Sequence, residues 1–227
     1  MGCAPWGYRL RIHAYPGDSE PRRPGHHALI QLSQNRKPLR KGRLFYIVVM
    51  RKLLFLDIDG VLVVYRRKED EELFDPGAMF HLNNICDLIP ELEIIISSSW
   101  RIGRTLEQLR EDFIKGGFKY PERIVDKTPR IFKFRQGQFQ AYSSTPRGLE
   151  VDEWIHDNCY MMHEGLSYKE ELEWREANPF LYAIVDDDGD MLYHQRNNFV
   201  QTKTNQGLTV QAAGRILKIL NPSKTTK

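Results

Sequence analysis

The chain has 227 residues, of which 41% are hydrophobic, and no stretch approaches the roughly 18 to 20 apolar residues of a membrane helix. Its net charge of +3 is uneven, because residues 1–49 hold nine Lys or Arg and two acids, whereas residues 50–227 hold 24 basic and 28 acidic residues. Overall basicity is therefore no evidence that the larger part of the chain binds nucleic acid.

The N-terminal segment, residues 1–49, is rich in Pro, Gly, Arg and His and has no helical or strand period. We predict a disordered basic extension there. Met50 directly precedes two basic residues and the first strand, as a translation start would. We therefore expect residues 1–49 to be an upstream extension or foreign to the native protein; a transit peptide and a basic nucleic-acid tail are the alternatives.

The first predicted strand, residues 53–57, is a continuous apolar run that ends in Asp57-Ile58-Asp59-Gly60. A run without alternation is typical of a strand covered on both faces, and Asp-Gly indicates a tight turn. Asp57 and Asp59 share one side of an extended segment. Two such carboxylates repel each other, so they favour a bound cation or a proton shared between them. The alternative is an ordinary Asp-Gly turn.

Further strands and helices alternate after this one, and polar residues follow the longer strands. Ser97, Ser98 and Ser99 close the second strand, and acids close the last one. This alternation predicts an α/β fold: a single Rossmann-like parallel sheet with helices on both faces and ligands at the carboxyl ends of the strands. We assign this domain to residues 50–221 and a tail to 222–227. The predicted elements are helix 76–89, strand 92–97, helix 105–116, a short strand near 123–125, helix 149–157, strand 181–185 and helix 208–220.

The last strand leads into Asp186, Asp187, Asp188 and Asp190, four carboxylates in five positions, which need a cation. An EF-hand loop is excluded, because Gly would have to follow Asp190 and Glu would have to occupy the twelfth position, where the chain has Met191 and Asn197. The histidines do not have the spacing of metal ligands; those considered are His156, His163 and His194.

These motifs, in this order, resemble the haloacid dehalogenase-like superfamily of Mg-dependent phosphatases. Three stretches resemble one branch more closely, the haloacid dehalogenase-like domain of Swiss-army-knife RNA repair proteins, over roughly residues 50 to 220. They are Ser-Ser-Ser-Trp-Arg from Ser97, Arg-Gly-x-Glu-Val-x-x-Trp from Arg147, and Val-Asp-Asp-Asp-x-Asp-Met from Val185.

The resemblance implies a role for each motif. Asp57 is the nucleophile that forms an aspartyl-phosphate, and Asp59 is the general acid and base. Ser97 or Ser98, together with Arg147, holds the phosphoryl oxygens, with Lys127 and Lys133 as rivals to Arg147. The Mg²⁺ ligands are taken from four acids: Asp57, Asp59, Asp186 and Asp187.

The expected substrate is a phosphate monoester, and the branch suggests a phosphorylated nucleic-acid end or a nucleotide. A small phosphorylated metabolite, transfer of the phosphoryl group to an acceptor other than water, and a non-catalytic binding module are the alternatives. About 40 residues separate the first two motifs, so we expect a capless domain or only a small cap insertion. Residues 158–178 form an insertion that lines the substrate entrance or merely covers the domain. Basic and aromatic residues at 130–135 are a candidate nucleic-acid patch, with a solvated loop as the alternative.

Cys3, Cys86 and Cys159 are odd in number and form no Cys-x-x-Cys pair. They favour a reducing compartment and no disulfide partner. We therefore expect a soluble cytoplasmic protein without a membrane partner.

Overall fold

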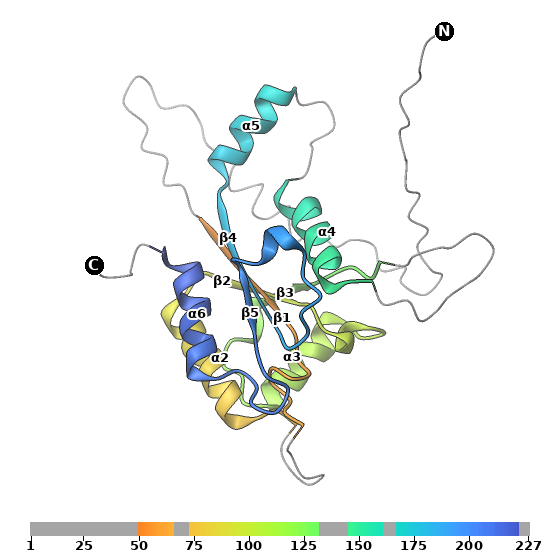
Figure 1. Cartoon of the computed structure of the whole chain (residues 1–227), viewed down its shortest axis with the longest axis vertical. Coiled ribbons are helices and arrows are strands. Elements are labelled where there is room, and N and C mark those ends of the chain that lie inside the picture. The colour runs from red at the N-terminus through yellow and green to blue at the C-terminus, as the bar shows by residue number, and fades with distance from the viewer. Residues whose placement is uncertain (1–49, 66–72, 132–144, 161–166, 223–227) are drawn as a thin grey trace, which may run out of the picture. The chain divides into compact units, whose positions relative to one another are not determined.

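The structure, a computed structural model, describes residues 50–65, 73–131, 145–160 and 167–222. Its centre is a five-stranded sheet in the order β3-β2-β1-β4-β5 (Figure 1). All four neighbouring pairs are parallel, which confirms the predicted α/β fold class. The strands are β1 (Arg51–Leu56), β2 (Leu92–Ile96), β3 (Ile124–Lys127), β4 (Phe180–Asp186) and β5 (Phe199–Gln201).

Helices cover both faces of this sheet. One hydrophobic cluster joins α2 (Pro76–Leu88), α3 (Leu106–Lys115) and α6 (Val210–Leu220) to one face, and a second joins α4 (Arg147–Cys159) to the other. Along β1, Leu54 and Leu56 belong to the first cluster and Leu53 and Phe55 to the second, all fully buried. Burial on both faces is the physical reason for the unbroken apolar run.

The register of the central strands decides where the functional residues lie. Leu56 in β1 pairs with Ile96 in β2 and with Val185 in β4. The next residues, Asp57, Ser97 and Asp186, therefore emerge side by side at the carboxyl edge of the sheet, as the polar strand ends predict.

The predicted elements are present with small shifts at their ends, but β5 was not predicted from the sequence. Strand β5 has three residues and is held by pairing Val200 with Val185. The insertion contains α5 (Tyr168–Ala177). The described residues also contain three short 3₁₀ helices: η1 (Ser99–Arg101), η2 (Pro121–Arg123) and η3 (Tyr193–Gln195).

Several predictions fall on residues that the structure does not describe. These are the extension 1–49 with Cys3, residues 161–166 of the insertion, most of the patch at 130–135 and the residues 223–227 of the tail; the size of any cap therefore stays a prediction. Cys86 and Cys159 are buried free thiols, and burial raises their pKa to about 12 and about 11. Within the described ranges, no helix has the length and apolar character to cross a membrane.

Candidate active site

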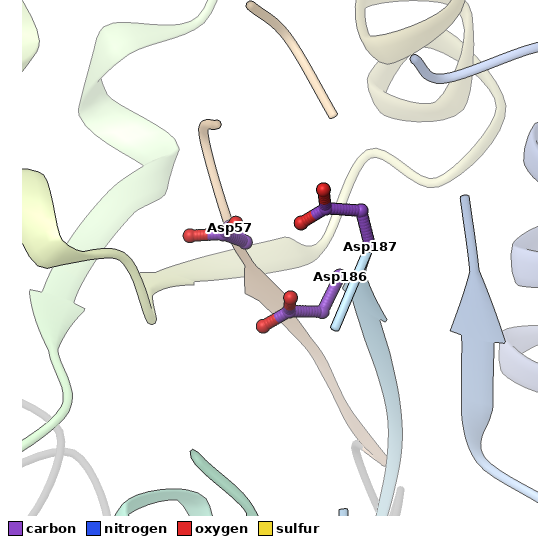
Figure 2. Close-up of side chains that lie close together, drawn as sticks. All are labelled: Asp57, Asp186 and Asp187. Carbon is purple, nitrogen blue, oxygen red and sulfur yellow. The ribbon is translucent and has the colours of Figure 1, made fainter. Parts of the chain in front are cut away.

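The carboxyl edge of the sheet gathers three acids from two neighbouring strands. Oxygen atoms of Asp57, Asp186 and Asp187 all lie within 4.8 Å of one another (Figure 2). Asp57 follows β1, and its backbone N–H donates to the Val185 carbonyl at 3.0 Å. Asp186 and Asp187 come from the end of β4. Backbone bonds between the strands thus fix the spacing of the acids.

Two of these acids are almost completely buried, Asp57 at 4% and Asp186 at 1% exposure. Burial, which removes water from the charged form, raises the pKa of Asp57 to about 6. For Asp186 burial and then the neighbouring Asp57 charge raise the pKa to about 8. Two buried carboxylates at this separation do not ionise together without a positive charge nearby.

The three acids fit a magnesium ion. Asp186 Oδ1 accepts a hydrogen bond from the Asp188 N–H at 2.9 Å, but Asp186 Oδ2 is buried without a hydrogen-bond partner. An orphaned buried carboxylate oxygen, next to two further carboxylates, is the type of ligand that Mg²⁺ prefers.

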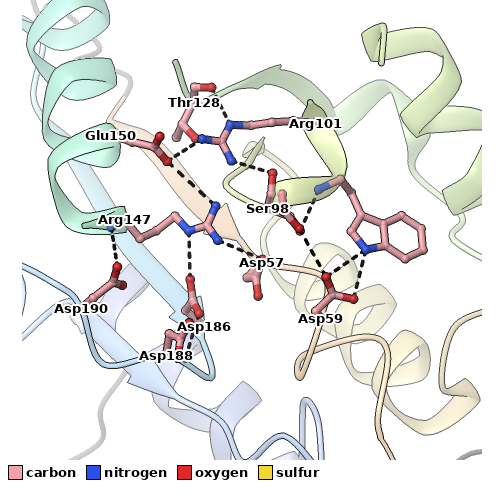
Figure 3. Close-up of polar contacts among 12 residues, drawn as sticks. Asp57, Asp59, Ser98, Arg101, Thr128, Arg147, Glu150, Asp186, Asp188 and Asp190 are labelled. Atoms are coloured by element: carbon pink, nitrogen blue, oxygen red, sulfur yellow. Dashed lines mark hydrogen bonds and ion pairs between the residues drawn. The ribbon is translucent and has the colours of Figure 1, made fainter. Parts of the chain in front are cut away.

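Asp59 was also predicted to be a magnesium ligand, but its side chain does not lie in this cluster of three acids. Both of its carboxylate oxygens lie 3.0 Å from the indole nitrogen of Trp100 (Asp59 is labelled in Figure 3). Asp59 lines the same cleft as Asp57, but its side chain contacts Trp100 in the η1 turn.

Arg147 brings a positive charge to the acids. Its guanidinium lies 3.9 Å from Asp57 Oδ1 and 3.6 Å from Asp186 Oδ2 (Figure 3). Both distances are ion-pair contacts, too long for hydrogen bonds. Arg147 is the first residue of α4, where its N–H donates to Asp190 Oδ2 at 2.8 Å. Because Asp190 caps the helix from the loop after β4, α4 begins two residues before the predicted start.

The two rivals to Arg147 are placed differently. Lys127 Nζ donates to the Arg104 carbonyl at 2.6 Å, and Lys127 is not among the residues lining the cleft. Lys133 lies outside the described residues.

The serines after β2 differ in their surroundings, although both are buried. A hydrogen bond from the Ser98 side chain lowers the pKa of Asp57 and opposes the larger effect of burial. Ser98 also caps η1, since its Oγ accepts from the Trp100 N–H at 3.4 Å. The Ser97 hydroxyl has no hydrogen-bond partner. Contact with Asp57 therefore favours Ser98 as the hydroxyl of the site.

A cleft of about 350 Å³ opens over these groups. A second cleft of similar volume, about 310 Å³, lies around Tyr160 and the start of β4, and its described lining includes no carboxylate. The first cleft contains the candidate catalytic groups and is lined by Asp57, Asp59, Tyr65, Ser99, Arg147, Asp187, Asp188 and Thr204.

A sequence model of one protein family, the HAD domain in Swiss Army Knife RNA repair proteins, matches residues 53–213. The chain belongs to this family. No curated protein and no solved structure matches the chain. Membership confirms the resemblance drawn from the motifs and supports a hydrolase of the HAD type.

Arg101 has a structural position in this HAD domain that we did not predict from the sequence. It is only 5% exposed, and its guanidinium donates to the Thr128 and Ser98 carbonyls at 2.9 and 2.6 Å. It also pairs with the buried carboxylate of Glu150, which lies 4.0 Å from the Arg147 guanidinium (Figure 3). Arg101 thus ties the loops after β2 and β3 to α4.

Close packing also fixes the position of Arg147 in this HAD domain. The start of α4 approaches the loop after β4 so closely that a Cβ at Gly148 would lie 2.6 Å from Gln195 Oε1 and from the Leu192 nitrogen. Gln195 is fully buried and donates to the Gly148 carbonyl at 2.9 Å. These contacts hold Arg147 beside the acids.

Proposed function

We propose that the protein is a Mg-dependent phosphomonoesterase that works through an aspartyl-phosphate on Asp57. The observation that supports this most is the setting of Asp57: a buried carboxylate that faces a cleft, with Arg147 on one side and Asp186 and Asp187 on another. A nucleophile, a cation for the phosphoryl oxygens and a set of metal ligands therefore share one cleft.

In the first step, an Asp57 carboxylate oxygen forms a bond to phosphorus while the bond from phosphorus to the leaving oxygen breaks. Asp59 gives its proton to that leaving oxygen, so the product leaves as an alcohol. Arg147 and Ser98 hold the phosphoryl oxygens, and a guanidinium suits this because it can bond two oxygens at once.

In the second step, water attacks the phosphorus of the aspartyl-phosphate and Asp59 takes a proton from it. The bond from phosphorus to Asp57 breaks, which releases inorganic phosphate and restores both carboxyl groups.

Asp57, Asp186 and Asp187 are the residues that would hold Mg²⁺. When bound, the ion supplies positive charge that offsets the repulsion between the Asp57 carboxylate and the phosphate.

For the substrate, we propose a phosphorylated nucleic-acid end or a nucleotide, supported by the family description of RNA repair proteins. A small phosphorylated metabolite is the alternative within the same chemistry. The lining of the cleft includes the side chain of Tyr65, which is 76% exposed, and an aromatic ring near a phosphate site is a surface on which a nucleobase can stack.

The experiment measures phosphate release from an aryl phosphate, from 3′- and 5′-phosphorylated oligonucleotides and from mononucleotides, with Mg²⁺ or with a chelator. We expect Mg-dependent release that is lost in Asp57→Asn and kept in the control Glu93→Gln, which removes a carboxylate bonded to Arg51, outside the cleft. A folded protein that binds Mg²⁺ and releases phosphate from no substrate would instead favour the non-catalytic binding module. Addition of alcohol acceptors, with analysis of products, separates hydrolysis from phosphotransfer.

A further inference from the structure

The side chain of Trp100 makes a contact that the proposed chemistry leaves unexplained. Its indole nitrogen lies 3.0 Å from each carboxylate oxygen of Asp59. The indole N–H is only a donor and has no lone pair to accept a proton. An Asp59 proton therefore cannot be directed at Trp100, and the carboxyl group must present it elsewhere.

The Trp100 ring makes two further contacts. The Phe74 ring centroid lies 5.8 Å from the Trp100 centroid, and the Arg104 guanidinium carbon lies 5.3 Å from the same centroid. Phe74 is buried at 1% exposure, so the ring rests on the core on one side, with a cation–π contact from Arg104. Such an indole is a fixed donor rather than a mobile one.

The other donor to Asp59 is weaker. Ser99 Oγ lies 3.5 Å from Asp59 Oδ2, and Ser99 is exposed. A bond at that distance adds little. The terminal torsion of an Asp side chain is broad, so of these two donors, both within the described residues, Trp100 restrains the rotation of the carboxylate more.

We propose that Trp100 is a positioning residue, which fixes the orientation of the Asp59 carboxyl group so that it presents its proton to the leaving group in the cleft beside Asp57. This inference rests on the proposed function, because it gives Asp59 the role of general acid. It assigns to the Ser97–Arg101 motif a second task besides holding phosphate, since Ser98 contacts Asp57 while Trp100 holds Asp59.

The test is Trp100→Phe, which removes the N–H donor and keeps an aromatic ring against Phe74. The substrates are two phosphate esters with Mg²⁺: p-nitrophenyl phosphate, whose leaving group needs little protonation, and an alkyl phosphate, whose leaving group needs a proton. We expect kcat/KM, which reports formation of the aspartyl-phosphate and not the later attack of water, to fall about tenfold or more on the alkyl ester but only about twofold on the nitrophenyl ester. In an Asp59→Asn background, Trp100→Phe should change kcat/KM by less than about twofold on either ester.

The control is Trp154→Phe. Trp154 Nε1 also donates to a carboxylate, Asp126 Oδ2, at 2.7 Å, but it belongs to the core cluster with α4. Its loss should leave the ratio of the two rates unchanged. Arg104→Ala is a second variant, because the Arg104 side chain is 40% exposed and its removal opens no core; we expect a smaller change of the ratio in the same direction.

The outcomes are distinct. Equal loss on both esters in Trp100→Phe, or full additivity with Asp59→Asn, would overturn the positioning role while the phosphatase proposal stands. A folded wild-type protein that releases phosphate from neither ester, nor from the phosphorylated oligonucleotides and mononucleotides, would refute the proposed function and this inference with it.

Discussion

Asp187 occupies the space that a side chain at Gly60 would need. A Cβ at Gly60 would lie 2.1 Å from Asp187 Oδ2, and Gly60 has a φ of +69°, a conformation that favours glycine. Gly60, in the first acidic motif, therefore leaves room for Asp187, a candidate metal ligand in the last acidic motif. This contact joins two motifs that the sequence presents far apart.

Substitution Gly60→Ala should move Asp187 and weaken Mg²⁺ binding by about tenfold, as loss of support around a metal ligand does. Gly103→Ala is the matched control, because Gly103 has a φ of +70° and a Cβ there would meet nothing within 4 Å. Both variants should lose about 1 to 2 kcal/mol from the left-handed backbone. Calorimetric titration with Mg²⁺ separates them, and equal affinities would contradict the contact.

Glu150→Gln should destabilise the protein by about 3 kcal/mol or more, because Arg101 would remain buried without its counter-ion. Burial already lowers the pKa of Arg101. Glu93→Gln, at a pair whose side chains are 24 to 28% exposed, should cost about 1 kcal/mol or less. Urea unfolding measures both free energies, and similar values would show that the buried pair has no special weight.

Stability of the metal-free protein should fall as pH rises from about 4 to about 8. The folded pKa of Asp57 is about 6 and that of Asp186 about 8, both above the ordinary pKa of 3.8, because both carboxyl groups are buried. Between pH 3.8 and the folded pKa of each group, the native state binds more protons than the unfolded state. The contribution of Asp57 and Asp186 to stability is therefore fully present below pH 3.8 and is lost as pH rises through about 6 and about 8.

Thermal unfolding with a chelator, compared with Asp186→Asn, measures this pH dependence. The variant should have the flatter slope, since it lacks one of the two groups. Mg²⁺ should raise the melting temperature of the wild type more at pH 8 than at pH 6. A slope that is unchanged in Asp186→Asn would contradict the assignment.

Arg147→Ala should lower kcat/KM for phosphate esters by about a hundredfold, and Arg147→Lys by less, because lysine keeps the charge but loses the paired donors. Lys127→Ala is the comparison that decides between the two cations: its amine bonds a backbone carbonyl, so we expect less than about a twofold effect on kcat/KM. A larger loss in Lys127→Ala than in Arg147→Ala would reverse the assignment.

Much of the fold could be predicted because the signals are local. Apolar runs that end in acids or hydroxyls identify β1, β2 and β4 with shifts of one or two residues at their ends. Strand β5 was not predicted because its three residues carry no period, and its pairing with β4 is a tertiary contact that the local sequence does not signal. The start of α4 was misjudged because its cap, Asp190, comes from another segment.

The candidate site was predictable only in part, for the same reason. Asp57, Asp186 and Asp187 follow strands, and their meeting at one edge follows from parallel pairing. The partners of Asp59 and Arg101 could not be predicted, since Trp100 and Glu150 become neighbours only through tertiary packing. An aromatic and a basic residue after a serine cluster carry no signal of their own.

A phosphoryl group on Asp57 can be trapped and detected. Asp59→Asn, which slows the attack of water, is mixed with an aryl phosphate and Mg²⁺, quenched in acid and analysed by peptide mass spectrometry. We predict a phosphorylated peptide that contains Asp57 and is absent from the Asp57→Asn variant. Turnover by Asp57→Asn at the wild-type rate, or a phosphoryl group on another residue, would contradict it.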